Sequence, residues 1–122
     1  MKILFLDDSN ERINTIKKYL GVKSNILHIA ESAPKAIALL KKYSPYDIVL
    51  LDHDLGDVNI IGEKTGYAVA KFITEMKPKL LPKRIIIHSH NPIGAMKMEA
   101  ILKINGIKSE KIPFSERMFV TR

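Results

Sequence analysis

Two patterns of apolar and polar positions alternate along this chain and predict its architecture. Short, mostly apolar runs are typical of strands buried on both faces of a sheet, and they lie at residues 2–6, 25–30, 47–51, 84–88 and 111–114. Between them, apolar residues recur every three or four positions, which indicates amphipathic helices. The predicted helices cover residues 11–20, 32–44, 65–77 and 91 to about 104.

Local stop and start signals support this division. Ser9 and Ser32 stand where a helix N-cap is expected, and Asn91-Pro92 reads as a cap followed by a first-turn proline. Gly21 and Asn105-Gly106 follow predicted helices, where glycine commonly ends them.

The order of elements predicts an α/β fold in three layers. Strands that alternate with helices favour a parallel sheet with right-handed crossovers. We expect a single domain over residues 1–122 with the flavodoxin-like strand order 2-1-3-4-5. Residues 115–122 leave room for a short final helix or a tail, but not for a full helix.

Polar residues follow three of the predicted strands. These groups are Asp7-Asp8, Asp52-His53-Asp54 and His88-Ser89-His90-Asn91. The predicted order places the three strands side by side, so their carboxyl ends meet at one edge, where such sheets bind ligands. If the extended geometry persists, Asp52 and Asp54 point to one side and His53 to the other. Converging carboxylates repel each other unless a cation or proton intervenes, which suggests a divalent metal.

Composition narrows the function classes. The 122 residues include no cysteine, which excludes disulfides and thiolate metal sites. No apolar run approaches the length of a membrane span, and the start of the chain is too acidic for a signal peptide, so we expect a cytoplasmic protein without a membrane partner. The net charge of +7 favours either a phosphate-rich partner or lysines on solvated helix faces.

The residues at these strand ends resemble those of response-regulator receiver domains. In that family an acidic pair ends the first strand, an aspartate ends the third and a serine or threonine ends the fourth. Asp7, Asp8, Asp52 and Ser89 fit those places. The resemblance implies that the acids bind magnesium and that Asp52 accepts a phosphoryl group. The family's Lys-Pro pair is interrupted here, because Ile112 separates Lys111 from Pro113, so we expect that Lys111 does not reach the site.

A closer resemblance is to cyclic-phosphate processing receiver domains. Three motifs carry it, and they stand in the expected order: Leu6-Asp7-Asp8-x-x-x-Arg12, then Leu51-Asp52-His53-Asp54-Leu55-Gly56, then His88-Ser89-x-Asn91-Pro92. This resemblance implies an activity on cyclic phosphates, such as nucleotide-derived or RNA-terminal ones.

The candidate metal ligands are Asp7, Asp8, Asp52 and Asp54. Hard cations prefer oxygen ligands, so Mg²⁺ or Mn²⁺ is the expected metal. The alternative is that Asp7 and Asp8 simply stabilise a helix N-terminus through its dipole. Histidines among the ligands would instead favour Mn²⁺, Fe²⁺ or Zn²⁺.

The candidate catalytic residues are His88, His53 and Asp52. A cyclic phosphodiester needs an attacking water and a protonated leaving oxygen, and histidine can serve either step near neutral pH. His88 is the first choice and His53 the second, although either one could be a structural histidine. Asp52 would act as a metal ligand or as a nucleophile. His28 and His90 are expected to be structural or exposed.

Ser89, Asn91 and Arg12 are the candidate phosphate-binding residues. Ser89 and the amides that open the last helix could bind an anion, because helix N-termini favour negative charge. Asn91 could instead only cap that helix. Arg12 could pair with phosphate or neutralise the acidic cluster.

Three functions fit these residues. The leading one is a metal-dependent phosphoesterase that acts on a cyclic phosphate in a small molecule or at an RNA end. The alternatives are an atypical receiver domain for phosphoryl signalling and a protein that binds a cyclic nucleotide without cleaving it. The apolar residues within 56–62 would form a flap over the site or pack down on the sheet edge. A further expectation is a homodimer through the sheet face that lacks a full last helix.

Overall fold

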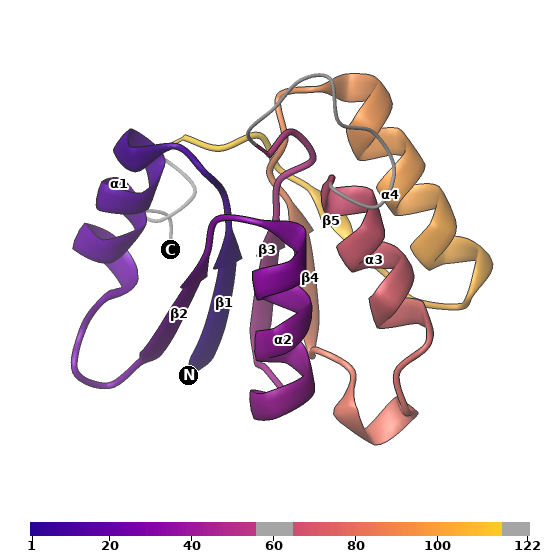
Figure 1. Ribbon diagram of the computed structural model, residues 1–122, viewed down its shortest axis with the longest axis horizontal. Helices are drawn as coiled ribbons and strands as arrows, with labels where there is room; N and C mark the ends of the chain where they lie inside the picture. The colour runs from indigo at the N-terminus through magenta and orange to yellow at the C-terminus, as the bar shows by residue number, and fades with distance from the viewer. Residues whose placement is uncertain (56–64, 116–122) are drawn as a thin grey trace.

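The computed structural model describes residues 1–55 and 65–115. Its five strands form one parallel sheet in the order β2-β1-β3-β4-β5 (Figure 1). The elements follow one another along the chain as β1 (Lys2–Leu6), α1 (Asn10–Leu20), β2 (Ile26–Ala30), α2 (Ala33–Tyr43), β3 (Ile48–Leu51), α3 (Gly66–Thr74), the 3₁₀ turn η2 (Pro78–Leu80), β4 (Arg84–Ile87), α4 (Pro92–Ile104) and β5 (Glu110–Lys111). The predicted fold class and strand order are therefore confirmed.

Two predicted elements have a boundary that differs from the structure by more than one residue. The third helix was expected to reach residue 77, but α3 ends at Thr74 and Pro78 opens the 3₁₀ turn. The last strand was expected at residues 111–114, but it is Glu110–Lys111. Pro113 lies between the two residues whose amides face β4, so its missing amide hydrogen falls on the outer edge of the sheet, where proline is tolerated. The amides of Ile112 and Phe114 donate to the carbonyls of Ile87 and His88, at 2.9 and 3.1 Å, and keep this segment beside β4.

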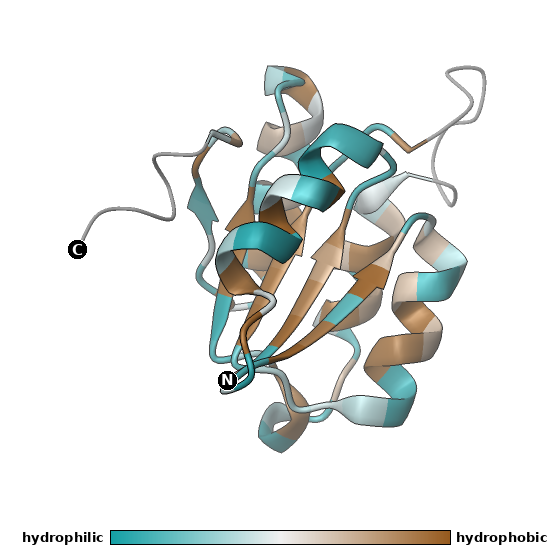
Figure 2. Cartoon of the chain, turned by 90° about the vertical axis from the view of Figure 1, so that its left-hand side faces the viewer, coloured by the Kyte–Doolittle hydropathy of each residue, from teal (hydrophilic) through white to brown (hydrophobic). Residues whose placement is uncertain are grey.

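The two faces of the sheet are covered unequally. Successive strand residues point to opposite faces, so Leu4 and Leu6 of β1 pack in a large cluster with α2, α3 and α4, whereas Ile3 and Phe5 pack in a smaller one with α1. In Figure 2 the strands at the centre of the molecule are largely brown, which marks their hydrophobic residues. This burial on both faces is why the strands read as continuous apolar runs.

On the face covered by α1, burial is complete at the centre of the sheet and partial toward β2, where Leu27 and Ile29 are half-buried. Leu50 of β3 and Ile86 of β4 are 1% and 6% exposed. Ile112 and Phe114, which follow β5, pack against this cluster. The predicted short last helix or tail, and the predicted flap with Gly56, Val58, Ile60 and Ile61, lie outside the described residues. The homodimer through this face stays a prediction.

Within the described ranges, no helix combines the length and the apolar character needed to cross a membrane.

Candidate functional site

The candidate site lies at the carboxyl edge of the sheet, the upper edge in Figure 1. Parallel pairing continues for one residue beyond each of three strands. The amides of Asp7, Asp52 and His88 donate to the carbonyls of Ala30, Leu6 and Leu51, at 3.0, 3.1 and 2.9 Å. The first polar residue after each strand is therefore held by the sheet itself and is buried.

These three residues form a compact group. One possible ligand atom from each of Asp7, Asp52 and His88 lies within 4.8 Å of the others, and all three side chains are buried. The expected gathering of the strand ends is thus present. Asp8 and Asp54, the other two predicted metal ligands, lie outside this group and line the pocket beside it.

The carboxylate of Asp7 is held by four hydrogen bonds. Arg12 donates from Nε to Oδ2 at 2.7 Å and from Nη2 to Oδ1 at 3.0 Å. The Ser9 amide adds a bond to Oδ1 at 2.9 Å, and His88 Nε2 lies 3.1 Å from Oδ2. Burial alone would raise the pKa of Asp7, but the bonds from His88 and Arg12 outweigh it and lower the pKa to about 2. Asp7 is therefore a carboxylate at neutral pH.

The carboxylate of Asp52 is buried with fewer partners. Its Oδ1 accepts the His53 amide at 2.9 Å, and its Oδ2 lies 3.7 Å from Arg12 Nη2. Burial raises the pKa of Asp52, and the negative charge of Asp7 raises it further. Negative charge at Asp52 is thus less compensated than at Asp7, and a cation beside it would be stabilising.

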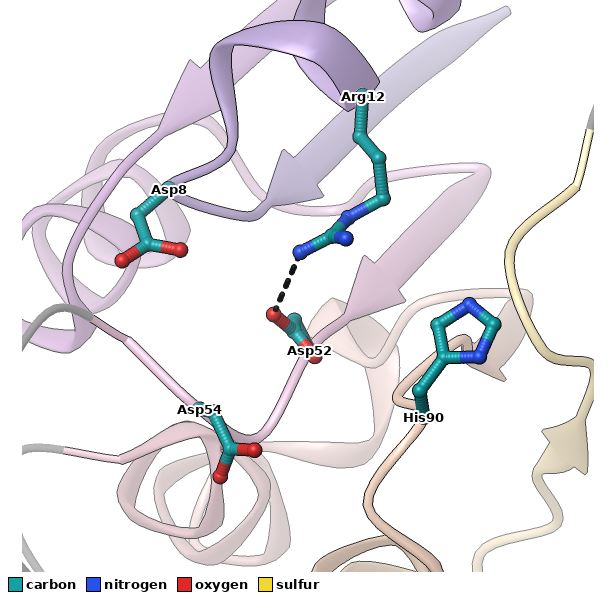
Figure 3. A pocket seen from close by; sticks show the side chains of 5 residues that line it. All are labelled: Asp8, Arg12, Asp52, Asp54 and His90. Atoms are coloured by element: carbon teal, nitrogen blue, oxygen red, sulfur yellow. Dashed lines mark ion pairs between the residues drawn. The ribbon is translucent and has the colours of Figure 1, made fainter. Parts of the chain in front are cut away.

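A pocket of about 310 Å³ opens next to this group (Figure 3). Its walls are formed by Asp8, Arg12, Asp52, Asp54 and His90. In Figure 3 the guanidinium of Arg12 reaches toward Asp52, with Asp54 and His90 on separate sides of the opening. The pocket thus combines carboxylates, which suit a cation, with an arginine and an imidazole, which suit a phosphate.

His88 and His53, the two histidines proposed as catalytic, are both engaged by carboxylates. His88 is 1% exposed and stacks on Phe5 with ring centroids 4.9 Å apart. Its Nε2 is hydrogen-bonded with Asp7 Oδ2. His53 Nδ1 lies 2.8 Å from Asp54 Oδ1. Its ring packs so closely on α4 that a Cβ at Gly94 would lie 2.4 Å from His53 Cγ.

His90 is the imidazole that lines the pocket. The sequence predicted that His90 is structural or exposed, and the residue is indeed exposed; what was not predicted is that it lines the pocket. The available signal was its spacing, because it stands two residues after His88, which follows β4 directly.

Asp54 accepts two hydrogen bonds and joins the loop after β3 to α4. His53 Nδ1 and Asn91 Nδ2 lie 2.8 and 3.1 Å from its Oδ1. The bond with His53 lowers the pKa of Asp54, and the bond with Asn91 adds to this effect. Asp52 and Asp54 both line the pocket, and His53 is not among its lining residues, but the strand ends at Leu51 and the chain bends at His53, whose ring bonds Asp54.

The predicted phosphate-binding residues differ in where they lie. Arg12 lines the pocket. Asn91 caps α4, since its Oδ1 accepts the Gly94 amide at 3.0 Å, and Ser89 Oγ accepts the Asn91 amide at 3.0 Å. Contact of Ser89 and Asn91 with phosphate stays a prediction.

The donor set fits a divalent metal. Asp7 and Asp52 supply two buried carboxylates, and oxygen ligands suit Mg²⁺ or Mn²⁺. His88 in the same group would also suit a transition metal. The fit rests on the excess of buried negative charge, which Arg12 compensates only in part.

Comparison with known proteins identifies the family. Residues 2–104 match the family described as "Cyclic-phosphate processing Receiver domain". The chain belongs to that family. No curated protein sequence matches it.

Solved structures similar to this cyclic-phosphate processing receiver domain are receiver domains. A CheY-like response regulator receiver domain protein from Methanospirillum hungatei is 17% identical, with TM-score 0.69 over 96% of this chain and 85% of the other. The chemotaxis protein CheY4 of Vibrio cholerae is 18% identical, with TM-score 0.65 over 95% and 89%. A Burkholderia pseudomallei response regulator, with a phosphorylated aspartic acid and a calcium ion, is 16% identical, with TM-score 0.67 over 96% and 62%. These likenesses show the fold.

This receiver domain departs from the usual pattern at Lys111. Its Nζ pairs with Glu99 Oε1 of α4 at 3.2 Å. The expectation that Lys111 does not reach the site agrees with this contact.

Proposed function

We propose that this receiver domain is a metal-dependent phosphoesterase that hydrolyses a cyclic phosphate. The supporting observation is the pocket in which Asp8, Asp52 and Asp54 face Arg12 and His90, beside the buried Asp7. Carboxylates that hold a cation and positive groups that hold a phosphate can both stabilise the charge that develops when a phosphodiester is hydrolysed. The family match to cyclic-phosphate processing supports the substrate class.

The reaction is a ring opening. Water adds to phosphorus, one ester P–O bond breaks, and the departing oxygen takes a proton, which leaves a phosphate monoester. A divalent metal held by the Asp7 and Asp52 carboxylates would supply positive charge opposite the phosphoryl oxygens. Substrates of this class include cyclic nucleotides and RNA ends with a 2′,3′-cyclic phosphate.

The chain's own residues take the remaining roles. Arg12 binds phosphoryl oxygens from the pocket wall, because a guanidinium matches them with two parallel donors. An imidazole protonates the leaving oxygen. The position of His90 in the pocket lining supports it for this role, and His88 and His53 remain the candidates named from the sequence.

A turnover assay tests this proposal. Purified protein with Mg²⁺ or Mn²⁺ is incubated with 2′,3′-cyclic nucleotides and cyclic dinucleotides, and products are followed by ³¹P NMR. We expect monoester product, and a decrease of about 100-fold or more in kcat for Asp52→Asn and for His90→Gln. Glu31→Gln is the matched control, because Glu31 is an exposed acid just past β2 and outside the pocket lining.

Three outcomes separate the candidate functions. No turnover across the panel would overturn the proposal, and tight binding with the ligand recovered intact would favour a non-catalytic binding protein. If His88→Ala or His53→Ala abolishes kcat while His90→Gln does not, the proton donor is the one named from the sequence.

Phosphoryl signalling is the second candidate. Asp52 follows β3 at the place of the receiver acceptor, and a similar structure carries a phosphorylated aspartic acid. Acetyl phosphate or BeF₃⁻ followed by mass spectrometry and NMR tests it, and stable modification of Asp52 would support it. The ion pair between Lys111 and Glu99 argues against it, because the resemblance to receiver domains implies a lysine from the last strand at the site.

A further inference from the structure

The Asp7 carboxylate has little capacity left for another partner. A carboxylate offers about four acceptor sites, and Asp7 has two bonds from Arg12, one from the Ser9 amide and one shared with His88. A metal that bound Asp7 would need one of these sites. The Ser9 amide belongs to the backbone at the start of α1, and His88 is stacked in the core, so Arg12 is the partner that can leave.

The Arg12 guanidinium supplies positive charge beside both carboxylates of the candidate metal group. It donates to Asp7 and lies 3.7 Å from Asp52, so it bridges these two carboxylates. The Arg12 side chain is 31% exposed and lines the pocket. A long, flexible side chain can therefore turn into the pocket while α1 stays in place.

We propose that Arg12 competes with the divalent metal for Asp7 and Asp52. When the metal binds, it displaces the guanidinium from Asp7, and Arg12 turns into the pocket, where it binds the phosphoryl oxygens of the substrate. This inference rests on the metal requirement of the proposed function. It adds that metal and phosphate bind cooperatively through one side chain.

Electrostatics gives the physical reason. A guanidinium is charged at every relevant pH, so a divalent ion between Asp7 and Asp52 meets a positive charge a few ångströms away in a buried site, where screening is weak. Moving Arg12 into the pocket relieves this repulsion. A bound phosphate then compensates the guanidinium, and by linkage the phosphate and the metal raise each other's affinity by the same factor.

The chain contains a matched control for this arrangement. Arg84 makes the same two-point contact with Glu110, with Nε to Oε2 at 2.6 Å and Nη2 to Oε1 at 2.8 Å. This pair lies at the start of β4, at the opposite end of that strand from the site. The Arg84 resonance therefore shows how the signal of a paired arginine behaves when no ligand binds beside it.

The first experiment follows the arginine Nε–H resonances of the wild-type protein by ¹⁵N NMR during an Mg²⁺ titration. Arg12→Lys assigns the Arg12 signal. We expect the Arg12 signal to move to the position of a solvent-exposed arginine as Mg²⁺ saturates, whereas the Arg84 signal stays in place. An Arg12 signal unchanged at saturating Mg²⁺ would overturn the inference.

The second experiment compares Mn²⁺ affinities by titration calorimetry without phosphate. Removal of the competing cation in Arg12→Met should tighten Mn²⁺ binding by about tenfold or more, and Arg84→Met should leave it unchanged. In the wild type, inorganic phosphate should tighten Mn²⁺ binding, and Arg12→Met should reduce that effect. Equal or weaker Mn²⁺ binding in Arg12→Met would contradict the competition.

The outcomes separate this inference from the proposed function. If no resonance responds to Mg²⁺ or Mn²⁺ and no heat is measured, both proposals fail together. If the metal shifts the Asp52 resonances but not that of Arg12, only the competition fails. Should Arg12→Met not fold, because Asp7 would be left buried without its partner, the titration of the wild type decides.

Discussion

Single residues at this site are held by contacts that the sequence does not display. The His53 ring fills the space beside Gly94, and its Nδ1 is bound to Asp54. His53 therefore joins the loop after β3 to the first turn of α4.

Gly94→Ala should destabilise the fold by about 1–3 kcal/mol, because the new Cβ would overlap the His53 ring. Urea denaturation measures this. In a His53→Ala background the overlap is gone, and the same change should be neutral or stabilise by up to about 1 kcal/mol, since alanine is the better helix former. Equal effects in both backgrounds would show that the ring is not the obstacle.

His28 predicts a pH dependence of stability. Burial lowers its pKa from the ordinary 6.5, and the charge of Lys2 lowers it further. Its Nδ1 lies 2.7 Å from the hydroxyl of Tyr46, whose pKa burial raises to about 12. The unfolded chain therefore binds the proton more readily, so His28's contribution is complete above pH 6.5 and is lost as pH falls toward the lower pKa of the folded state.

Denaturation of the wild type and of His28→Gln at pH 7.5 and pH 5.5 tests this dependence. The wild type should lose more free energy of unfolding on acidification than the variant, because glutamine can accept the Tyr46 bond without titrating. The same loss in both proteins would rule out His28 as the source.

At the scale of the elements, Asn91 both caps α4 and links that helix to the loop after β3. Asn91 caps the helix through Oδ1 and holds Asp54 through Nδ2. The cap was one of the two roles that its place before Pro92 suggested, whereas the link to Asp54 joins residues far apart in the chain.

Asn91→Ala should lower the free energy of unfolding by about 1 kcal/mol through loss of the cap. Asn91→Ser, which keeps a capping oxygen but loses the amide donor, should lose less. Ser32→Ala, which removes only the α2 cap, is the control in the same denaturation series. If serine destabilises as much as alanine at position 91, the link to Asp54 carries the stability rather than the cap.

Element prediction succeeded where local patterns were unambiguous. The strand bounds of β1 and the caps at Ser9 and Ser32 follow from an apolar run and from side-chain chemistry near in sequence. The last strand was misplaced because its bounds depend on pairing with β4, and a two-residue strand leaves no periodicity to detect.

At the scale of the whole molecule, the helices are distributed unequally over the sheet. Among the described residues, three helices cover one face and α1 covers the other. The homodimer expected from this imbalance is testable by light scattering at high protein concentration, where a dimer mass is the expected result. A monomer under those conditions would remove the idea.

The sequence by itself determined the order of strands and helices, the family, and which polar residues stand at the strand ends, because periodicity, caps and motifs are local. It could not determine which charged side chains at that edge pair with one another. Only the tertiary structure decided that Asp7 is hydrogen-bonded to Arg12 and His88. It also decided that Asp54 is hydrogen-bonded to His53 and Asn91, and that His90 lines the pocket. Such pairings depend on distances between side chains from separate elements, and those distances exist only once the sheet is assembled.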